Sequence, residues 1–309
     1  MFTPHLRWKL RAIAKRLERQ LDTWKNLWLG TQITTRMCPS CRALIGISET
    51  SCSLCGATLP RRPSGLGKLV ANILPHYAPV TYTLLTVNFL VFLAMFISEQ
   101  KQTLEDISHL LMGNDRRALA AWGADVGALV AQGQWWRLVS GMFIHIGIIH
   151  LLFNSYALMF IGPLLEELLG KERFFVTYVT TGIFGFILSN WYYPVWLTTA
   201  GASGAIFGMI GLAVVISKRW GSWGRMLQQQ LVHWIIYAFI FGIFIGANNA
   251  AHMGGALSGV GLGFVLSNPN RQEESPYKQC FWRILYWGCL ALTVTSLIMA
   301  CHNRFLVQG

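Results

Sequence analysis

The stretch Gly201-Ala-Ser-Gly-Ala-Ile-Phe-Gly208 places Ser203 among small residues at the start of an apolar segment. A second apolar segment starts with Ala251-His-Met-Gly-Gly255, which contains His252. Small residues recur at helical spacing on one face of each segment, namely at Gly204, Gly208 and Gly211 in the first and at Gly255, Gly259 and Gly263 in the second. Such faces let helix backbones approach closely. The two segments are therefore predicted to pack together as helices.

The rest of the chain has the composition of a membrane protein. Of its 309 residues, 53% are hydrophobic and 12% are charged, whereas average globular chains carry about 25% charged residues. Seven apolar blocks are long enough to cross a hydrocarbon layer of about 30 Å: residues 79–98, 145–165, 174–193, 201–217, 231–248, 251–267 and 281–300. The predicted fold is therefore an all-α polytopic membrane protein.

Basic residues are distributed unevenly along the chain. Of 25 Lys and Arg residues, twelve lie in residues 1–70. With the N-terminus inside, the few that fall outside are Lys101, Arg116, Arg117, Arg137 and Arg304, which satisfies the positive-inside rule. We therefore expect a multi-pass protein of the plasma (inner) membrane with a cytoplasmic N-terminus and an outside C-terminus. The net charge of +12 reflects this topology, and no nucleic-acid partner is expected.

Residues 1–30 carry apolar side chains at close to helical spacing, with Lys and Arg between them. They lack the continuous apolar core of a signal peptide. The pattern predicts a basic amphipathic helix. Such a helix either lies on the membrane surface against anionic lipid or packs on a soluble domain of this chain, and the sequence leaves both interpretations open.

Two Cys-x-x-Cys pairs follow in residues 36–60: Cys38 with Cys41, and Cys52 with Cys55. This spacing is typical of a four-thiolate structural Zn²⁺ site, and a reducing cytoplasm disfavours disulfides. A segment of about 25 residues is also too small to fold on an apolar core alone. We therefore predict a cytoplasmic zinc ribbon whose partner is unknown. A linker, residues 61–78, joins it to the membrane part.

Ser203 and His252 are predicted to lie at the same membrane depth, because each begins a helix that runs inward. Close packing then brings the serine hydroxyl within hydrogen-bond reach of the imidazole. No intramembrane Asp offers itself as a third member, so the residues indicate a Ser–His dyad. Phe207, one turn after Ser203, is placed to stack on His252. The backbone N–H of Ser203 is an unpaired donor at a helix start, which suits an oxyanion.

His150 and Asn154 lie four residues apart and so share one helix face. Polar side chains inside a membrane span are energetically unfavourable and invite a functional hypothesis. The alternative role is interhelical hydrogen bonding, but two such residues near the outer leaflet favour a role as oxyanion donors. Glu166, at the other end of this span, lies far from the histidines in depth and is interpreted as a structural hydrogen-bonding anchor.

A long outside loop, about residues 99–143, precedes this span and ends in Gly133-Gln-Trp-Trp-Arg137. Loops of this length in compact proteins are usually functional or structured. Because tryptophan is enriched at membrane interfaces, Trp135 and Trp136 suggest that this loop partly embeds in the interface.

Over residues 79–270 the chain resembles the rhomboid intramembrane serine proteases. The resemblance rests on five motifs that occur in the order typical of the family: Gly133-Gln-Trp-Trp-Arg137, His145-x4-His150-x3-Asn154, Gly162-x3-Glu166-x3-Gly170, Gly201-x-Ser203-Gly204 and Ala251-His252-x2-Gly255-x3-Gly259. The Gly-x-Ser-Gly motif is weak by itself, whereas five motifs in order are highly specific.

The resemblance implies a rhomboid-like bundle of six spans, residues 79–270, followed here by a seventh span and tail, residues 271–309. It implies Ser203 as the nucleophile and His252 as the general base and then acid. The implied oxyanion donors are His150, Asn154 and the Ser203 N–H. The implied supporting residues are His145, Phe207, Gly201, Gly204, Gly255, Gly259, Glu166 and Arg137. Phe207 stands where many members of the family have Tyr, so it can stack but cannot donate a hydroxyl.

The family cleaves transmembrane helices of membrane-protein substrates near their outer end, through an acyl-enzyme and without a cofactor. Substrate is then expected to reach the site between spans, beside the fifth. The main alternative is a non-catalytic rhomboid-like protein that binds membrane clients for quality control. Such relatives typically lose the serine or the histidine, and this chain keeps both. A zinc-dependent membrane hydrolase is disfavoured, because the cysteines are expected to be cytoplasmic and to form a closed set.

Overall fold

The structure, a computed structural model, describes residues 35–37, 44–46, 49–58, 78–98, 115–218, 221–266 and 275–308. The chain divides into two compact units, Met1–Pro75 and His76–Gly309. The predicted amphipathic helix, most of the predicted linker, and Cys38 and Cys41 lie outside the described residues.

The first unit contains two short antiparallel pairings. Strands β1 (Thr35–Met37) and β2 (Leu44–Gly46) pair with Thr35 opposite Gly46, and an isolated bridge joins Ser51 to Thr58. Each pairing therefore spans one of the two Cys-x-x-Cys pairs.

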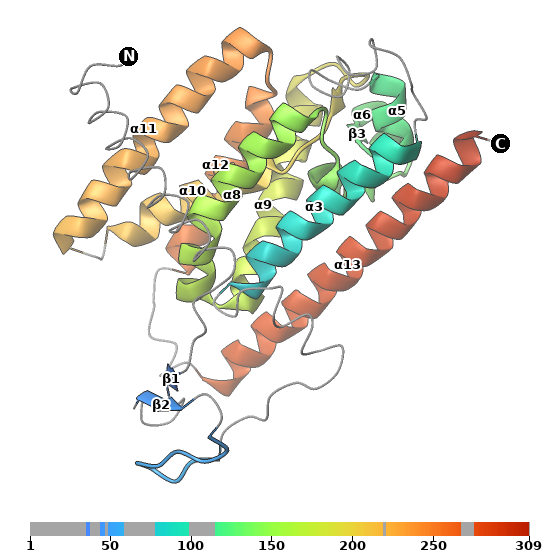
Figure 1. The fold of residues 1–309 in the computed structure, drawn as a ribbon. Coiled ribbons are helices and arrows are strands. Elements are labelled where there is room, and N and C mark those ends of the chain that lie inside the picture. The colour runs from blue at the N-terminus through green and yellow to red at the C-terminus, as the bar shows by residue number, and fades with distance from the viewer. Residues whose placement is uncertain are drawn as a thin grey trace, which may run out of the picture. The chain divides into compact units, whose positions relative to one another are not determined.

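The second unit is a bundle of helices (Figure 1). Its long helices are α3 (Pro79–Ser98), α8 (Ile148–Leu169), α9 (Lys171–Tyr192), α10 (Ser203–Ser217), α11 (Gly221–Ile245), α12 (Asn249–Val265) and α13 (Pro276–Gln308). Among the described residues, five helices are long and apolar enough to cross a membrane, namely α3, α8, α9, α11 and α13. The expected all-α polytopic membrane fold is confirmed.

Helix α10 is the central element of this unit. It packs against α8, α9, α11 and α12, and all but two of its 15 residues are buried. At about 1.5 Å per residue it is roughly 22 Å long, which is shorter than a hydrocarbon layer of about 30 Å. Its glycines Gly204, Gly208 and Gly211 let neighbouring helices approach closely, which accounts for its place between them.

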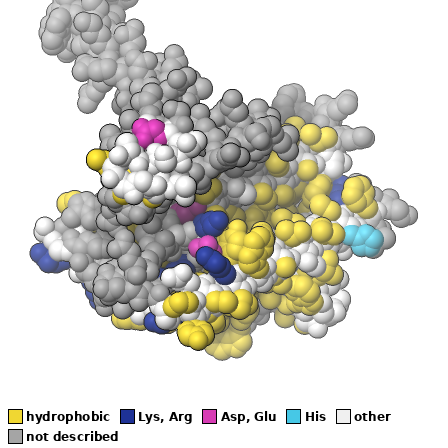
Figure 2. Space-filling view, turned by 90° about the horizontal axis from the view of Figure 1, so that it is seen from below, with side chains coloured by type: hydrophobic (Ala, Val, Ile, Leu, Met, Phe, Trp, Pro, Cys, Tyr) yellow, Lys and Arg dark blue, Asp and Glu magenta, His cyan; other side chains and the backbone are white. Residues whose placement is uncertain are grey.

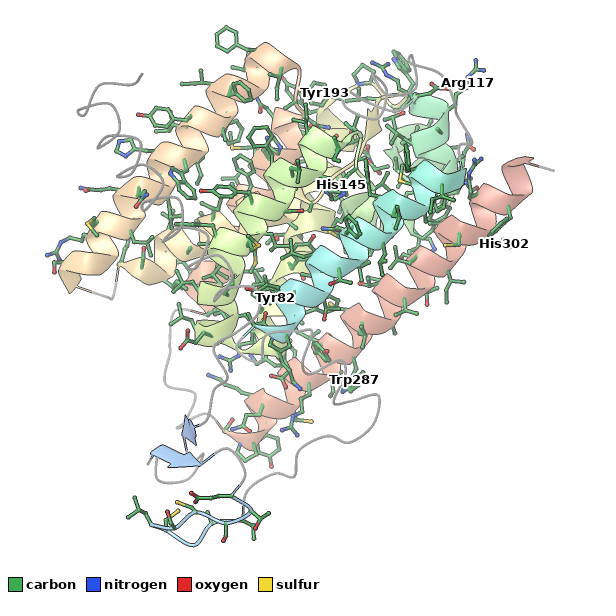
Figure 3. All side chains as sticks on the ribbon, viewed as in Figure 1. Tyr82, Arg117, His145, Tyr193, Trp287 and His302 are labelled. Atoms are coloured by element: carbon green, nitrogen blue, oxygen red, sulfur yellow. The ribbon has the colours of Figure 1, made fainter. Side chains whose placement is uncertain are left out.

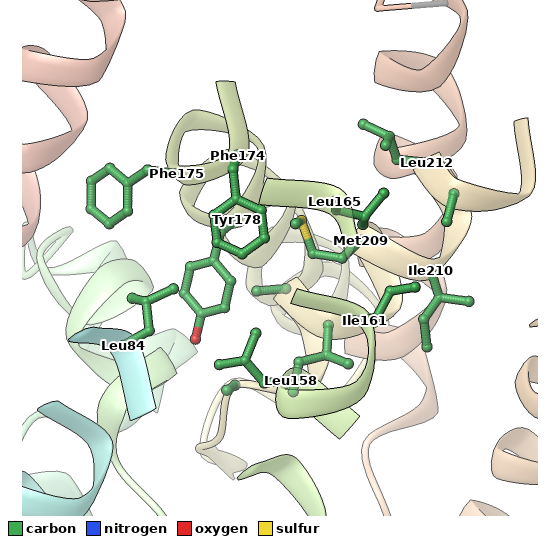
Figure 4. Packing of buried hydrophobic residues seen from close by; sticks show 14 of the residues in the cluster. Leu84, Leu158, Ile161, Leu165, Phe174, Phe175, Tyr178, Met209, Ile210 and Leu212 are labelled. Carbon is green, nitrogen blue, oxygen red and sulfur yellow. The ribbon is translucent and has the colours of Figure 1, made fainter. Parts of the chain in front are cut away.

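The main core forms where α8, α9 and α10 meet (Figure 4). Leu158, Ile161 and Leu165 project from α8 at helical spacing, and they meet Tyr178 of α9 and Met209 of α10. All five side chains are 0–1% exposed. The sequence brings these three helices together because each carries bulky apolar side chains on the face that meets the others.

The surface of the helical unit is also rich in apolar side chains. Large hydrophobic residues are exposed along α3, α8, α11 and α13, and hydrophobic side chains outnumber charged ones on the face in Figure 2. Extended apolar surface of this kind is unusual on a soluble monomer and is what a lipid-facing surface requires.

The segment between α3 and α8 contains short elements: α5 (Arg116–Ala121), β3 (Asp125–Val126), α6 (Gly127–Ala131), α7 (Arg137–Ser140) and the 3-10 turn η1 (Gly141–Phe143). Strand β3 pairs antiparallel with β4 (Thr198–Thr199), the strand that leads into Ser203. The loop before α8 is thus joined to the loop before α10.

Arg137 holds this segment together from inside. Its side chain is 2% exposed, and its guanidinium Nη1 donates to the carbonyls of Ala120 at 2.6 Å and Ala124 at 2.9 Å. The two tryptophans of this segment differ: Trp135 is 47% exposed, whereas Trp136 packs inside. Its ring is 4% exposed and lies under the Arg137 guanidinium at 4.5 Å, because it fills the interior of the segment.

Helix α13 runs along one side of the bundle, against α9, α7 and α5 (Figure 1). Near its C-terminal end, Asn303 Nδ2 donates to the carbonyl of Ala121 at 2.8 Å. Near its N-terminal end, the Trp282 ring lies 5.3 Å from the guanidinium of Arg173. The last helix therefore contacts both ends of the bundle.

Candidate active site

Ser203 and His252 meet at the N-terminal ends of two adjacent helices. Ser203 is the first residue of α10 and His252 lies in the first turn of α12. The Nε2 atom of His252 lies 2.9 Å from the Oγ atom of Ser203, which is hydrogen-bond distance. His252 is 9% exposed and Ser203 is partly buried.

Glycines allow α10 and α12 to come this close. A β carbon on Gly255 would lie 2.8 Å from the carbonyl carbon of Gly204, and one on Gly259 would lie 2.6 Å from that of Gly208. Real side chains do not approach backbone so closely. The glycine faces identified in the sequence are therefore the faces in contact, and the register they impose brings Ser203 level with His252.

Aromatic rings hold the imidazole of His252. The Phe207 ring stacks on it with centroids 4.3 Å apart and an interplanar angle of 11°. Phe239 of α11 approaches the edge of both rings, at 6.1 Å from His252 and 5.4 Å from Phe207. The sequence predicts the first contact but contains no sign of the second, because Phe239 lies in a uniformly apolar run.

The other nitrogen of His252, Nδ1, is buried and has no hydrogen-bond partner among the described residues. In a Ser–His–Asp triad a carboxylate would occupy this position and set the tautomer of the ring. Among the described residues, Ser203 and His252 therefore form a pair without a third polar member, and the imidazole is stacked on Phe207.

His150 and Asn154 lie in the first two turns of α8, and the His150 ring lies against Gly201, two residues before Ser203. Asn154 is 5% exposed, and its Nδ2 donates to the carbonyl of His150 at 2.9 Å. The His150 ring lies 5.4 Å from that of His145. His145, labelled in Figure 3, is fully buried just before α8.

Gly201 connects the histidine of α8 to the serine of α10. A β carbon on Gly201 would lie 2.6 Å from Cε1 and 2.9 Å from Nε2 of His150. The backbone there has φ +123°, a conformation that glycine adopts readily, and the Gly201 N–H donates to the carbonyl of Gly141 at 2.9 Å. Gly201 thus lets His150 lie directly against the backbone that leads to Ser203.

Glu166 lies at the far end of α8 from His150, so it is not part of this site. Its carboxylate accepts hydrogen bonds from the backbone N–H groups of Val80 at 2.8 Å and Thr81 at 2.7 Å, and from the Thr81 hydroxyl at 2.8 Å. Glu166 therefore caps the N-terminus of α3 from α8. This contact matches the interpretation of Glu166 as a hydrogen-bonding anchor.

A polar cluster behind the dyad is absent from the sequence-based predictions. Asn248, at the N-cap of α12, donates to the hydroxyls of Ser189 at 2.6 Å and Thr199 at 2.8 Å. A signal for Asn248 was present, because asparagine before a helix start is a common N-cap. Ser189 and Thr199 carry no local pattern that marks them.

Comparisons with known proteins place the chain in a family. A family model described as the Rhomboid domain matches residues 132–269. Rhomboid protease GluP from Bacillus subtilis is 39% identical over 154 residues, which cover 49% of this chain and 30% of that protein. Rhomboid-like protease 3 from Toxoplasma gondii is 33% identical over 193 residues, 60% of this chain and 70% of that protein. Putative rhomboid protease YdcA from Bacillus subtilis is 37% identical over 141 residues, 45% of this chain and 68% of that protein.

These relatives and the helical bundle define the class: the chain is a multi-pass membrane protein that belongs to the rhomboid family. The chain spans less than a third of GluP and about two thirds of the other two relatives.

Proposed function

We propose that this chain is an intramembrane serine endopeptidase that cleaves transmembrane helices of other membrane proteins through Ser203 and His252. The observation that carries the proposal is the 2.9 Å contact between Ser203 Oγ and His252 Nε2 at the N-terminal ends of two closely packed helices. The names of relatives as rhomboid proteases support the reaction class.

Acylation begins with proton transfer from Ser203 to His252. As the Ser203 Oγ attacks the carbonyl carbon of the scissile bond, Nε2 of His252 takes the hydroxyl proton. The C–N bond then breaks, and the same proton passes to the leaving amine. The product that remains is an ester between the substrate acyl group and Oγ.

Water completes the reaction. His252 takes a proton from a water molecule that attacks the ester carbonyl, and the C–Oγ bond breaks as the proton returns to Ser203. Each step moves one proton through Nε2, so a single imidazole suffices for both halves.

Hydrogen-bond donors near Ser203 can stabilise the negative charge that develops on the carbonyl oxygen. The Ser203 N–H is among the first donors of α10, which have no acceptor inside their own helix. The Asn154 amide and the His150 ring approach from α8, and Asn154 exchanges its hydrogen bond to the His150 carbonyl for one to the oxyanion. Donors aimed at this charge in a dry site contribute several kcal/mol, typically about 3–4 for one donor.

The substrate helix reaches the dyad beside α11. Helix α11 is exposed along most of its length, and its Phe239 ring packs edge-on against the His252 ring. A ring contact between Trp234 of α11 and Phe160 of α8, at 4.6 Å, bridges the two helices. Separation of α11 from α8 therefore opens a lateral path to Ser203 from the lipid.

The direct test measures cleavage of a helical membrane substrate by purified protein in liposomes. Wild type is expected to cut, whereas Ser203→Ala and His252→Ala are not. Ser258→Ala is a matched control, because among the described residues this serine of α12 bonds only the Gly255 carbonyl of its own helix, at 2.8 Å. Equal cleavage by Ser203→Ala and Ser258→Ala would refute the dyad. Substrate that binds wild type but is never cut would favour the client-binding alternative.

We further propose an orientation with the N-terminus in the cytoplasm and the dyad opening to the outer face of the plasma membrane. The support is the concentration of Lys and Arg in residues 1–70. In right-side-out vesicles, an N-terminal tag is expected to resist added protease and a C-terminal tag to be removed. The reverse pattern contradicts the orientation.

A structural zinc site in residues 36–60 is also a proposal, for Cys38, Cys41, Cys52 and Cys55. The turn at Cys52 supports it. The Gly56 N–H donates to the Cys52 carbonyl at 2.9 Å, and Gly56 adopts φ +70°, so the chain reverses tightly between the two cysteines of that pair. One zinc per purified full-length chain is expected, with less in Cys52→Ser. A folded wild-type preparation without zinc contradicts the site.

A further inference from the structure

The side-chain amide of Asn248 is the centre of a hydrogen-bond cluster that does not touch the reacting atoms. Its Nδ2 donates to Ser189 Oγ at 2.6 Å and to Thr199 Oγ1 at 2.8 Å. Its Oδ1 accepts from the backbone N–H of Ala251 at 2.9 Å and so caps α12. Both ends of the amide are therefore in use at once.

This cluster joins the two segments that carry the dyad. Asn248 lies four residues before His252, and its carbonyl accepts the His252 N–H at 3.2 Å in the first turn of α12. Thr199 lies four residues before Ser203. The hydrogen bond between Asn248 and Thr199 is thus a second link between these segments, apart from the contact of Ser203 with His252.

The cluster is anchored to the rest of the bundle. Ser189, near the end of α9, is 1% exposed, and Thr199 is 6% exposed. Thr199 also pairs with Asp125 across β4 and β3, and Asp125 Oδ1 accepts a hydrogen bond from Asn190 Nδ2 at 3.1 Å. Buried hydrogen bonds of this kind make a network rigid.

The link matters because no described residue forms a hydrogen bond to the far side of the His252 imidazole. Nδ1 of His252 has no partner among the described residues. Stacking on Phe207 fixes the plane of the ring, but it restrains sliding within that plane weakly. The position of the α12 N-terminus relative to Ser203 then determines the distance from Oγ to Nε2.

We propose that Asn248 is a positioning residue of this protease, which holds the N-terminus of α12 against Thr199 so that His252 stays in reach of Ser203. This inference rests on the proposed function. Asn248 acts through His252 and does not contact substrate.

The chemistry of the cluster separates its two roles. The two roles are the helix cap at Ala251 and the link to Thr199. Asn248→Asp keeps both roles, because one carboxylate oxygen accepts from the Ala251 N–H while the other accepts from the Ser189 and Thr199 hydroxyls, which can donate as well as accept. Serine caps helices well but is too short to reach Thr199. Asn248→Ser therefore removes the link and leaves the cap. Thr199→Val removes the link from the other side without a change of shape, whereas Thr199→Ser keeps the hydroxyl.

The experiment compares these variants in cleavage kinetics in liposomes and in the rate at which a fluorophosphonate labels Ser203. Asn248→Ser and Thr199→Val are expected to lower kcat and the labelling rate roughly ten- to a hundredfold, the range for a displacement of about 1 Å. KM should stay within about twofold, because the substrate contacts are intact. Asn248→Asp and Thr199→Ser should stay within about threefold of wild type.

A double variant and a control separate positioning from general destabilisation. If both substitutions remove the same hydrogen bond, kcat of the double variant Asn248→Ser with Thr199→Val is no lower than that of the less active single variant. Thr86→Val is the control, since in the part of the chain that the structure describes this exposed α3 hydroxyl bonds only the Tyr82 carbonyl of its own helix, at 2.8 Å. Thermal unfolding midpoints show that all variants are folded at the assay temperature.

The outcomes are distinct. An unreactive wild type refutes the proposed function itself. A reactive wild type with full kcat in Asn248→Ser and Thr199→Val overturns the positioning role. The positioning role is also overturned if the variants change KM alone, or if the decreases in kcat of the two single variants multiply in the double variant.

Discussion

Substitution of Gly255 by alanine tests whether the backbone contact between α10 and α12 sets the catalytic distance. The added β carbon would lie 2.8 Å from the carbonyl carbon of Gly204, 3.3 Å from its Cα, and closer still to its carbonyl oxygen. Carbon atoms in contact require about 3.5–4.0 Å. The obstructing atoms are backbone and cannot rotate away, so α12 must retreat from α10 by about 1 Å.

A retreat of this size acts directly on the dyad, because His252 lies one turn before Gly255. The distance of 2.9 Å from Ser203 Oγ to His252 Nε2 would grow to about 3.9 Å, beyond the hydrogen-bond range. Misplacement by about 1 Å lowers catalytic rates roughly a hundredfold. Overpacking of this kind also lowers the free energy of unfolding by about 1–3 kcal/mol.

The control for this prediction lies on the same helix. A β carbon on Gly261 meets no atom within 4 Å, so Gly261→Ala makes the same chemical change without the collision. Cleavage rate in liposomes and thermal unfolding in detergent are measured for both variants. Gly261→Ala is expected to match wild type, and alanine is favoured over glycine inside a helix. If Gly255→Ala matches Gly261→Ala in both measurements, the close approach of the two helices does not determine the site.

Three further predictions concern other parts of the bundle. Burial raises the pKa of Asp125 to about 7, against the opposing effects of Asn190 and Arg137. The protonated carboxyl therefore contributes its full stability below about pH 4, and this contribution is lost as the pH rises to about 7. In unfolding measurements, the free energy of unfolding of wild type relative to Asp125→Asn should fall by roughly 2–3 kcal/mol between about pH 5 and pH 8. If this difference between the two proteins does not change with pH, the prediction is wrong. Glu166→Ala leaves buried donors at the start of α3 without an acceptor and should lower the unfolding free energy by about 2–4 kcal/mol, with Glu167→Ala, its exposed neighbour, as the control. Phe207→Leu removes the ring stacked on His252 and should lower kcat roughly three- to tenfold, whereas Phe207→Tyr keeps stacking and activity; equal rates for the two variants would show that the stacking is dispensable.

The sequence predicts the helices well because their signals are local. Apolar blocks of sufficient length indicate membrane helices, and the predicted block 79–98 coincides with α3, Pro79–Ser98. The glycines of residues 201–211 and 251–263 repeat at helical spacing, so the spacing alone indicates which faces meet. A pairing of helix faces and a common depth are enough to expect contact between Ser203 and His252.

Local patterns do not reveal the polar contacts around the dyad. The hydrogen bonds of Asn248 reach Thr199 and Ser189 across 49 and 59 positions of the chain, and Asn303 bonds Ala121 across 182. The sequence around each residue looks the same whether the distant partner is present or absent. For the same reason Trp136 looks like an interfacial residue, although it packs beneath Arg137.

The sequence thus predicts a chain that spans a membrane, the helix faces that pack together, and a contact between Ser203 and His252. Hydrophobic length and small-residue spacing act within single helices, and a linear pattern records them. The orientation of the imidazole, the polar cluster behind it and the contacts of the segment before α8 appear only in the folded structure. These depend on side chains that meet only after the helices have packed, and their geometry follows from that packing.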